Sequence, residues 1–159
     1  MPQLERTPPL VLVVDDEALV LELVTTRLTL AGYRTCIARN GFDALEQLST
    51  MRPDAMLLDI NMPGLDGFGV MQDMQNTGMI RCVPTLVLTA RNQPEDVNRA
   101  LALGARDYLA KPFKDSQLRA RVARLVRKVE PLSSSIRVDQ EQVPGSGTSG
   151  SSKPATATS

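Results

Sequence analysis

The sequence predicts an α/β fold in which a parallel five-stranded sheet is covered by helices on both faces. Short apolar, β-branched runs alternate with segments whose apolar residues recur every three to four positions. The connections between these segments are short and contain glycine, proline and asparagine. Strands this uniformly apolar are typical of parallel sheets that are buried on both faces.

The five expected strands are short and end in polar or turn-forming residues. The first is the continuous apolar run of residues 10–14, and the third, residues 55–58, is equally apolar. The complete set comprises residues 10–14, 33–38, 55–58, 85–88 and 107–110. Each strand is followed by a helical segment, which favours right-handed crossover connections and a parallel sheet.

The five expected helices each carry an apolar stripe at helical spacing. Gly32, Gly78 and Gly104 end the first, third and fourth helices, Asp66 offers an N-cap for the third, and Pro94 begins the fourth. The expected inward-facing residues are Leu21, Val24, Leu28 and Ala31 in the first helix, Ala44, Leu45 and Leu48 in the second, Phe68, Met71 and Met74 in the third, Val97, Ala100 and Leu101 in the fourth, and Leu118, Val122, Leu125 and Val129 in the fifth.

Composition limits the classes of function that this chain can have. The 159 residues carry no net formal charge, so bulk electrostatics point neither to nucleic acid nor to a membrane. Histidine is absent, which excludes histidine-based catalysis and the usual zinc ligand sets. Cys36 and Cys82 are expected to be free thiols. No segment has the pattern of a secretion signal or a membrane span, and a cytoplasmic location is therefore expected.

Three segments are expected along the chain. Residues 1–8 form an N-terminal extension, residues 9–130 the α/β domain, and residues 131–159 a tail rich in serine, glycine, threonine and proline. A segment of that composition cannot bury enough apolar surface to offset its ordering entropy, so the tail is expected to be disordered. Its glycine–serine stretch suits a linker and a free terminus equally well.

Reactive side chains follow four of the five strands. Asp15 and Asp16 follow the first, Asp59 the third and Lys111 the fifth, while Thr89 ends the fourth. In a parallel sheet all carboxyl ends lie at one edge, where ligands bind, so these groups are expected to meet there. Taken singly, each has a plainer interpretation as a helix cap, a strand residue or a solvated charge.

Crowded carboxylates repel one another and either take up a proton or bind a cation. With oxygen ligands only, Mg²⁺ fits best, because it prefers one or two carboxylates and a phosphate oxygen. Lys111 and Thr89 then suit a phosphoryl group on Asp59, whose carboxylate oxygen can act as the nucleophile.

This combination of motifs resembles the receiver domain of two-component response regulators over about residues 9–130. The matching motifs are Asp15-Asp16, Asp59 with Met62-Pro63-Gly64 and Asp66-Gly67, Thr89-Ala90, Gly104-Ala105, and Asp107-Tyr108-Leu109-Ala110-Lys111-Pro112-Phe113. The resemblance implies a flavodoxin-like, doubly wound sheet with strand order 2-1-3-4-5. It also implies a switch that accepts a phosphoryl group, rather than an enzyme, with autophosphorylation from small donors and autodephosphorylation within its chemistry.

The resemblance also implies roles for individual residues. Asp59 accepts the phosphoryl group from a phosphohistidine on a sensor histidine kinase or phosphotransfer protein. Asp15, Asp16, Asp59 and the backbone carbonyl of Asn61 hold Mg²⁺, Lys111 bridges to the phosphoryl group, and the Lys111–Pro112 peptide bond is cis. Thr89 and Tyr108 rearrange the face formed by the fourth helix, the fifth strand and the fifth helix. Tyr108 could instead be an ordinary core aromatic.

Several positions vary from common receiver patterns. Ala102 and Arg106 stand where many dimerising receivers have acids, although Arg121 matches the basic side, so dimerisation through that face is in doubt. Asn61 and Arg91 occupy positions that tune dephosphorylation in the family. Other basic residues on the fifth helix are interpreted as a solvated face, and no direct nucleic-acid binding is expected.

Three hypotheses for the output follow. The first is a stand-alone receiver that passes its phosphoryl group on or binds an unidentified protein partner when phosphorylated. The second is the regulatory module of a longer regulator with a DNA-binding or enzymatic output. The third, a pseudo-receiver that binds partners without phosphorylation, is disfavoured because Asp15, Asp16, Asp59, Thr89 and Lys111 are all present.

Overall fold

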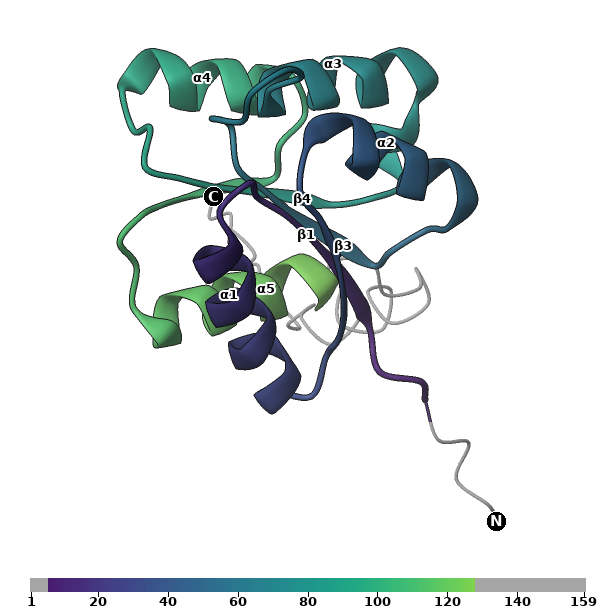
Figure 1. Ribbon diagram of the computed structural model, residues 1–159, viewed down its shortest axis with the longest axis vertical. Helices are drawn as coiled ribbons and strands as arrows, with labels where there is room; N and C mark the ends of the chain where they lie inside the picture. Colours follow the sequence, from purple (N-terminus) through teal and green to yellow (C-terminus); the bar gives the residue numbers. More distant parts are fainter. Residues whose placement is uncertain (1–5, 128–159) are drawn as a thin grey trace, which may run out of the picture. The chain divides into compact units, whose positions relative to one another are not determined.

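A parallel sheet of five strands runs through the centre of the domain (Figure 1). The computed structural model describes residues 6–127. The strands lie in the order β2-β1-β3-β4-β5, which confirms the expected doubly wound topology. Their bounds are Leu10–Val14 for β1, Arg34–Ala38 for β2, Ala55–Leu58 for β3, Thr85–Thr89 for β4 and Asp107–Ala110 for β5.

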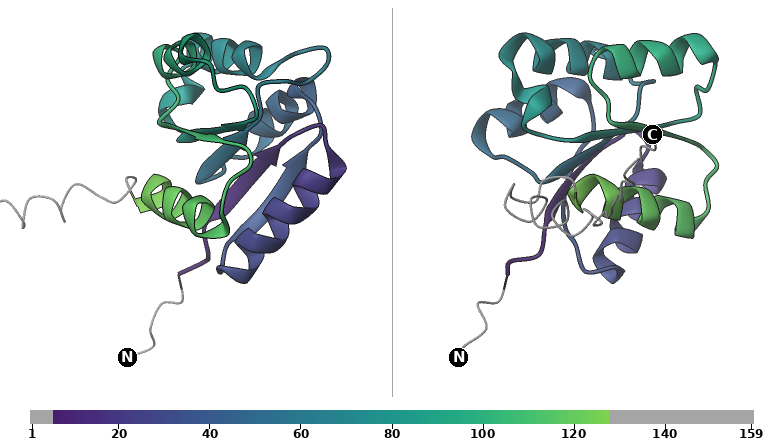
Figure 2. Two further views of the ribbon diagram at one scale, coloured as in Figure 1. Left: turned by 90° about the vertical axis from the view of Figure 1, so that its left-hand side faces the viewer. Right: turned by 180° about the vertical axis from the view of Figure 1, so that it is seen from behind.

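Helices cover both faces of this sheet. The helices α1 and α5 pack on one face and α2, α3 and α4 on the other (Figures 1 and 2). The helix bounds are Ala18–Leu30 for α1, Gly41–Thr50 for α2, Gly67–Thr77 for α3, Pro94–Ala102 for α4 and Asp115–Arg127 for α5. A short 3-10 turn, η1, covers Met79–Arg81 and was not expected from the sequence.

The alternation of side chains along each strand produces two hydrophobic cores. Leu12 and Val14 of β1 pack with α2, α3 and α4, whereas Val11 and Val13 pack with α1 and α5. All four of these side chains are buried. Because both faces of β1 are covered, the strand is apolar throughout. The first position that can accommodate a charged side chain is the residue after the strand ends.

The fourth helix packs differently from the prediction. Its buried residues are Asp96 and Ala100, while Leu101, expected to face inward, is 46% exposed. The buried stripe of α4 therefore begins at the carboxylate of Asp96. Apolar periodicity does not indicate such a position, because the residue is charged. The other differences are a β2 that starts at Arg34, a β4 that includes Thr89, and an exposed Ala31 at the end of α1.

Part of the predicted organisation lies outside the described residues. This applies to residues 1–5 of the expected N-terminal extension, to Val129 of the fifth helix, and to the expected tail of residues 131–159.

The turn after β3 holds the end of that strand against α3. The Asp66 side chain caps α3 by accepting a hydrogen bond from the Gly69 amide at 2.8 Å. The amide of Gly67 donates to the carbonyl of Ile60 at 2.9 Å. A β-carbon on Gly67 would lie 2.5 Å from the Asp59 carbonyl oxygen, so only glycine permits this close approach of two backbones.

We expect Gly67→Ala to lower the free energy of unfolding by about 2 kcal/mol, because the added methyl group must displace the backbone of Asp59. Gly69→Ala is the matched control: its methyl group meets the Cδ1 atom of Leu65 at 2.5 Å, and that flexible side chain can move. Urea unfolding of both variants measures the difference. Equal losses would contradict this account of Gly67.

Candidate functional site at the carboxyl edge of the sheet

Parallel register brings Asp15 and Asp59 side by side. Val14 is paired with Leu58 at the ends of β1 and β3, and each carboxylate is the next residue along the chain. The Asp59 amide continues the ladder by donating to the Val14 carbonyl at 3.0 Å. Both aspartates are buried, at 2% and 4% exposure. The fold thus places two carboxylates, largely removed from water, at adjacent strand ends.

Lys111 provides the positive charge between these carboxylates. Its Nζ atom lies 2.7 Å from Oδ2 of Asp15 and 3.5 Å from Oδ2 of Asp59. The Lys111 amide donates to the Thr89 carbonyl at 2.9 Å, which fixes the backbone just beyond β5. The Lys111–Pro112 peptide bond is cis. One ammonium group therefore faces two acids, and the cluster of these three side chains keeps an excess of negative charge.

Burial and neighbouring charges shift the pKa values of this cluster. Burial raises the pKa of Asp59, and the Thr89 hydroxyl and the Lys111 ammonium only partly oppose this effect. Burial alone would lower the pKa of Lys111, but its hydrogen bond to Asp15 and the charge of Asp59 raise it overall. Lys111 is therefore held in its charged form, while ionised Asp59 lacks full compensation.

Glu17 places a third acid near this cluster, whereas the expected part of Asp16 in a metal site stays a prediction. Carboxylate oxygens of Asp15, Glu17 and Asp59 all lie within 4.8 Å of one another, close enough to hold a cation together. The Glu17 amide donates to Oδ1 of Asp15 at 2.9 Å, which folds the chain back at the start of α1. Asp16 is exposed and is not one of this group. Sequence reasoning stopped at the acid pair, although a third acid follows it directly.

Asn61 lies at the mouth of the site. Its amide donates to Oδ1 of Asp59 at 3.3 Å, so the turn after β3 also orients the carboxylate. Its side-chain oxygen accepts a hydrogen bond from Nη1 of Arg91 at 3.4 Å. The turn after β3 is thereby connected to the β4–α4 loop.

Arg91 also connects the two residues expected to move. The Thr89 hydroxyl, on a fully buried residue, accepts a hydrogen bond from the Arg91 amide at 3.3 Å. The Tyr108 hydroxyl donates to the Arg91 carbonyl. The Tyr108 ring is partly buried against the core, and burial raises the pKa of its hydroxyl. Thr89 and Tyr108 therefore meet at the backbone of one residue.

The expected dimer-face residue Arg121 is paired within its own chain. Its Nη1 atom lies 2.7 Å from Oδ1 of Asp107 and 3.2 Å from the Tyr108 carbonyl. These contacts tie α5 to β5.

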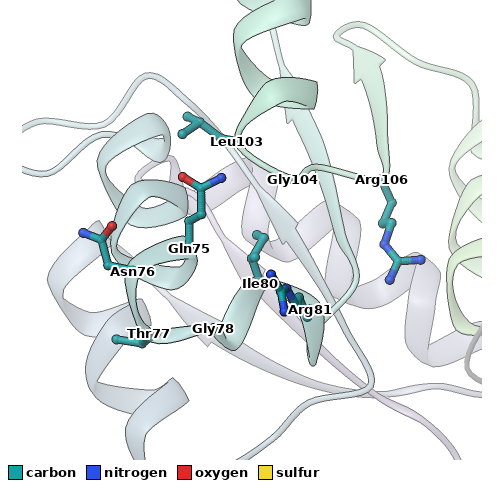
Figure 3. A pocket seen from close by; sticks show the side chains of 9 residues that line it. All are labelled: Gln75, Asn76, Thr77, Gly78, Ile80, Arg81, Leu103, Gly104 and Arg106. Atoms are coloured by element: carbon teal, nitrogen blue, oxygen red, sulfur yellow. The ribbon is translucent and has the colours of Figure 1, made fainter.

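A surface hollow of the described domain lies elsewhere. Figure 3 shows it between the end of α3, η1 and the loop that leads into β5. Its volume is about 580 Å³. Arg81 and Arg106 precede β4 and β5, so this hollow is at the amino edge of the sheet. None of the expected site residues lines it, and the chemistry described above belongs to the opposite edge.

Comparison with known proteins identifies the family. The model of the response regulator receiver domain matches residues 11–123. The chain belongs to this family. Similar proteins include the response regulator MprA of Mycobacterium avium, 41% identical over 76% of this chain and 52% of MprA. Another is the probable transcriptional regulator ycf27 of Pyropia yezoensis, 37% identical over 85% of this chain and 54% of that protein. The chain thus spans about half the length of these relatives.

Solved receiver structures share the fold. The receiver domain of the Francisella response regulator 1452 superposes with a TM-score of 0.72 at 30% identity, over 77% of this chain and 99% of that one. The chemotaxis response regulator CheY4 of Vibrio cholerae gives a TM-score of 0.70 at 32% identity, over 75% of this chain and 99% of that one.

None of the helices within residues 6–127 has the length and apolar character that a membrane span requires.

We expect Lys111→Met to lower the free energy of unfolding by about 2 kcal/mol in EDTA, because it leaves two buried carboxylates without their cation. In an Asp59→Asn background the same change should cost about half as much, since only one of the two acids remains. Chemical denaturation of the four proteins measures this coupling. Equal costs in both backgrounds would show that Lys111 does not stabilise the pair of acids.

Asp59→Asn should stabilise the metal-free receiver at pH 7. Burial raises the folded-state pKa of Asp59 above its ordinary value of 3.8, so ionisation of this group opposes folding. This penalty is absent below pH 3.8, grows as the pH rises through the folded-state pKa, and is then constant. The gain from Asp59→Asn should therefore shrink as the pH is lowered from 7 towards 4.

Thermal unfolding across this pH range in EDTA tests the sign. The control is Asp73→Asn, which removes an exposed carboxylate from α3. A gain that is independent of pH, or equal in the control, would contradict the assignment to Asp59.

Proposed function

We propose that this receiver is a phosphorylation-dependent switch in which Asp59 accepts a phosphoryl group from a phosphohistidine. The donor would be a sensor histidine kinase or a histidine phosphotransfer protein. The observation that carries the proposal is the buried Asp59 carboxylate with the Lys111 ammonium 3.5 Å away and further acids beside it. A buried carboxylate with incomplete charge compensation is typical of functional sites, because its burial costs folding free energy that a purely structural role does not require.

The transfer requires little covalent chemistry from the protein. A carboxylate oxygen of Asp59 attacks phosphorus, an O–P bond forms, and the N–P bond to the imidazole breaks. The imidazole nitrogen keeps the electron pair and takes up a proton from water. Lys111 offsets negative charge on the phosphoryl oxygens. The Thr89 hydroxyl, which lowers the pKa of Asp59, would donate a hydrogen bond to them.

The acids at this edge suit Mg²⁺. They offer only oxygen ligands, and the whole sequence lacks histidine. Asp15 and Asp59 would hold the ion together with the backbone carbonyl of Asn61. Either Asp16 or Glu17 would supply a further carboxylate. When bound, Mg²⁺ would neutralise charge on the acids and on the phosphoryl oxygens.

Phosphorylation would be read at the face formed by α4, β5 and α5. Thr89 and Tyr108 both bond to Arg91, so movement of the Thr89 hydroxyl towards a phosphoryl group would disturb the support of Tyr108. Tyr108 lies on β5, between α4 and α5, where a partner could detect its position. The receiver thereby acts as a phosphoacceptor switch, not as a catalyst with turnover.

The output remains a choice between a stand-alone receiver and the regulatory part of a longer protein. The length of the relatives favours the second, since this chain matches about half of each and one of them is named a probable transcriptional regulator. In that case the α4-β5-α5 face would control an attached DNA-binding output. A phosphorylation-independent receiver is disfavoured because the acids, Thr89 and Lys111 meet at one edge.

Incubation with a small phosphodonor such as acetyl phosphate should add the mass of one phosphoryl group to the wild-type chain. The addition should require Mg²⁺ and should be absent in Asp59→Asn, because the nucleophilic oxygen is replaced. Intact-mass spectrometry measures it, and donor consumption in the same samples reveals phosphorylation followed by rapid hydrolysis.

Asp73→Asn serves as the control that removes an acid away from the site, and it should be phosphorylated like the wild type. An unmodified wild-type chain together with an unconsumed donor would contradict the proposed function. Unchanged modification of Asp59→Asn would place the phosphoryl group on another residue.

A further inference from the structure

The side chain of Arg91 is shared between the site and α4. Its Nε atom lies 2.9 Å from Oδ2 of Asp96, and its Nη1 atom lies 3.4 Å from Oδ1 of Asn61. Asn61 in turn bonds through its amide to the Asp59 carboxylate. The guanidinium group of Arg91 therefore stands between the acid that would be phosphorylated and an acid on the helix expected to respond.

Asp96 is an unusual residue for its position. It belongs to the packed stripe of α4, and its side chain is 12% exposed. A carboxylate this buried needs compensation, and Arg91 supplies an ion pair with good geometry. This pair ties the first turn of α4 to the β4–α4 loop.

Arg91 is held by Asp96 but not enclosed. Its side chain is 40% exposed, and its guanidinium lies 5.5 Å from the centre of the Phe68 ring. Arg99 stacks on the same ring at 4.1 Å. Two like charges thus lie against one aromatic ring, and their repulsion favours an acceptor that draws one of them away.

We infer that Arg91 changes partner on phosphorylation, leaving Asp96 to bind the phosphoryl group on Asp59 and so releasing the first turn of α4. The inference rests on the proposed function of Asp59. It assigns Arg91 a second role as a phosphoryl ligand and makes Asp96 its competitor.

The charges favour this exchange. A phosphoryl group carries more negative charge than a carboxylate and offers three acceptor oxygens to a guanidinium group. Asp96 does not become an isolated buried charge when Arg91 leaves, because it lies in the first turn of α4. The positive end of the helix dipole stabilises an anion there. The Arg91–Asp96 ion pair can therefore hold α4 in the unphosphorylated receiver and still be displaced by a phosphoryl group.

The linkage predicts opposite effects for the two partners. Asp96→Asn removes the competitor and should tighten the binding of beryllofluoride, a phosphoryl mimic, about five- to tenfold in the presence of Mg²⁺. Arg91→Gln removes the ligand and should weaken it by a similar factor. In the double variant, Asp96→Asn should have no further effect, because no arginine remains to be released. Amide NMR titration measures the affinities.

Glu95→Gln is the matched control. It removes the same charge from the same turn of α4, but Glu95 is exposed and forms no ion pair within residues 6–127. Its affinity for beryllofluoride should change less than twofold. Hydrogen exchange of the α4 amides gives a second readout: exchange should be faster in Asp96→Asn before any ligand is added, and unchanged in Glu95→Gln.

Two results would overturn the exchange. One is an equal effect of Asp96→Asn and Glu95→Gln, which would attribute the change in affinity to general electrostatics and not to the Arg91–Asp96 pair. The other is an effect of Asp96→Asn that persists without Arg91. Intact mass after treatment with the phosphodonor separates these from failure of the proposed function: if Asp59 is phosphorylated, only the exchange is wrong, and if the wild type is neither phosphorylated nor bound by beryllofluoride, both fall.

Discussion

The ion pairs of Lys111 with Asp15 and Asp59 are the interactions on which this site depends. Three strands deliver these side chains from points far apart in the sequence, and the distances of 2.7 and 3.5 Å exist only when β1, β3 and β5 are all in register. A single ammonium group does not neutralise the surrounding acids. Burial is the main cause of the raised pKa of Asp59, and the charge of Asp15 adds to it, so a cation bound at this site would stabilise the ionised form of Asp59.

The route from this cluster to the surface passes through one loop. Arg91 contacts the turn after β3 through Asn61, the end of β4 through Thr89, and β5 through Tyr108. Its ion pair with Asp96 extends these contacts to α4. A change of charge at Asp59 therefore meets a connected set of polar contacts rather than a uniform apolar core, and such contacts have discrete alternatives.

The sequence predicted the sheet and the main site residues because both depend on local, periodic information. Continuous apolar runs mark buried strands, and the parallel topology alone places Asp15, Asp59 and Lys111 at one edge. The remaining residues depend on side-chain packing. Glu17 approaches the acids because the chain turns back at α1, and Asp96 is buried because α4 packs through a polar position. Apolar periodicity detects neither, so Leu101 was wrongly expected inside and Asp96 was missed.

Locating the modified residue tests the central claim most directly. The acyl phosphate formed with a small donor and Mg²⁺ can be reduced with borohydride, which converts the modified aspartate into homoserine, and peptide mass spectrometry then finds its position. The account predicts homoserine at residue 59 alone. Homoserine at residue 15 or 16, or a phosphoryl group that survives on a serine or threonine, would contradict the assignment of Asp59 as the nucleophile that Lys111 and its neighbouring acids prepare.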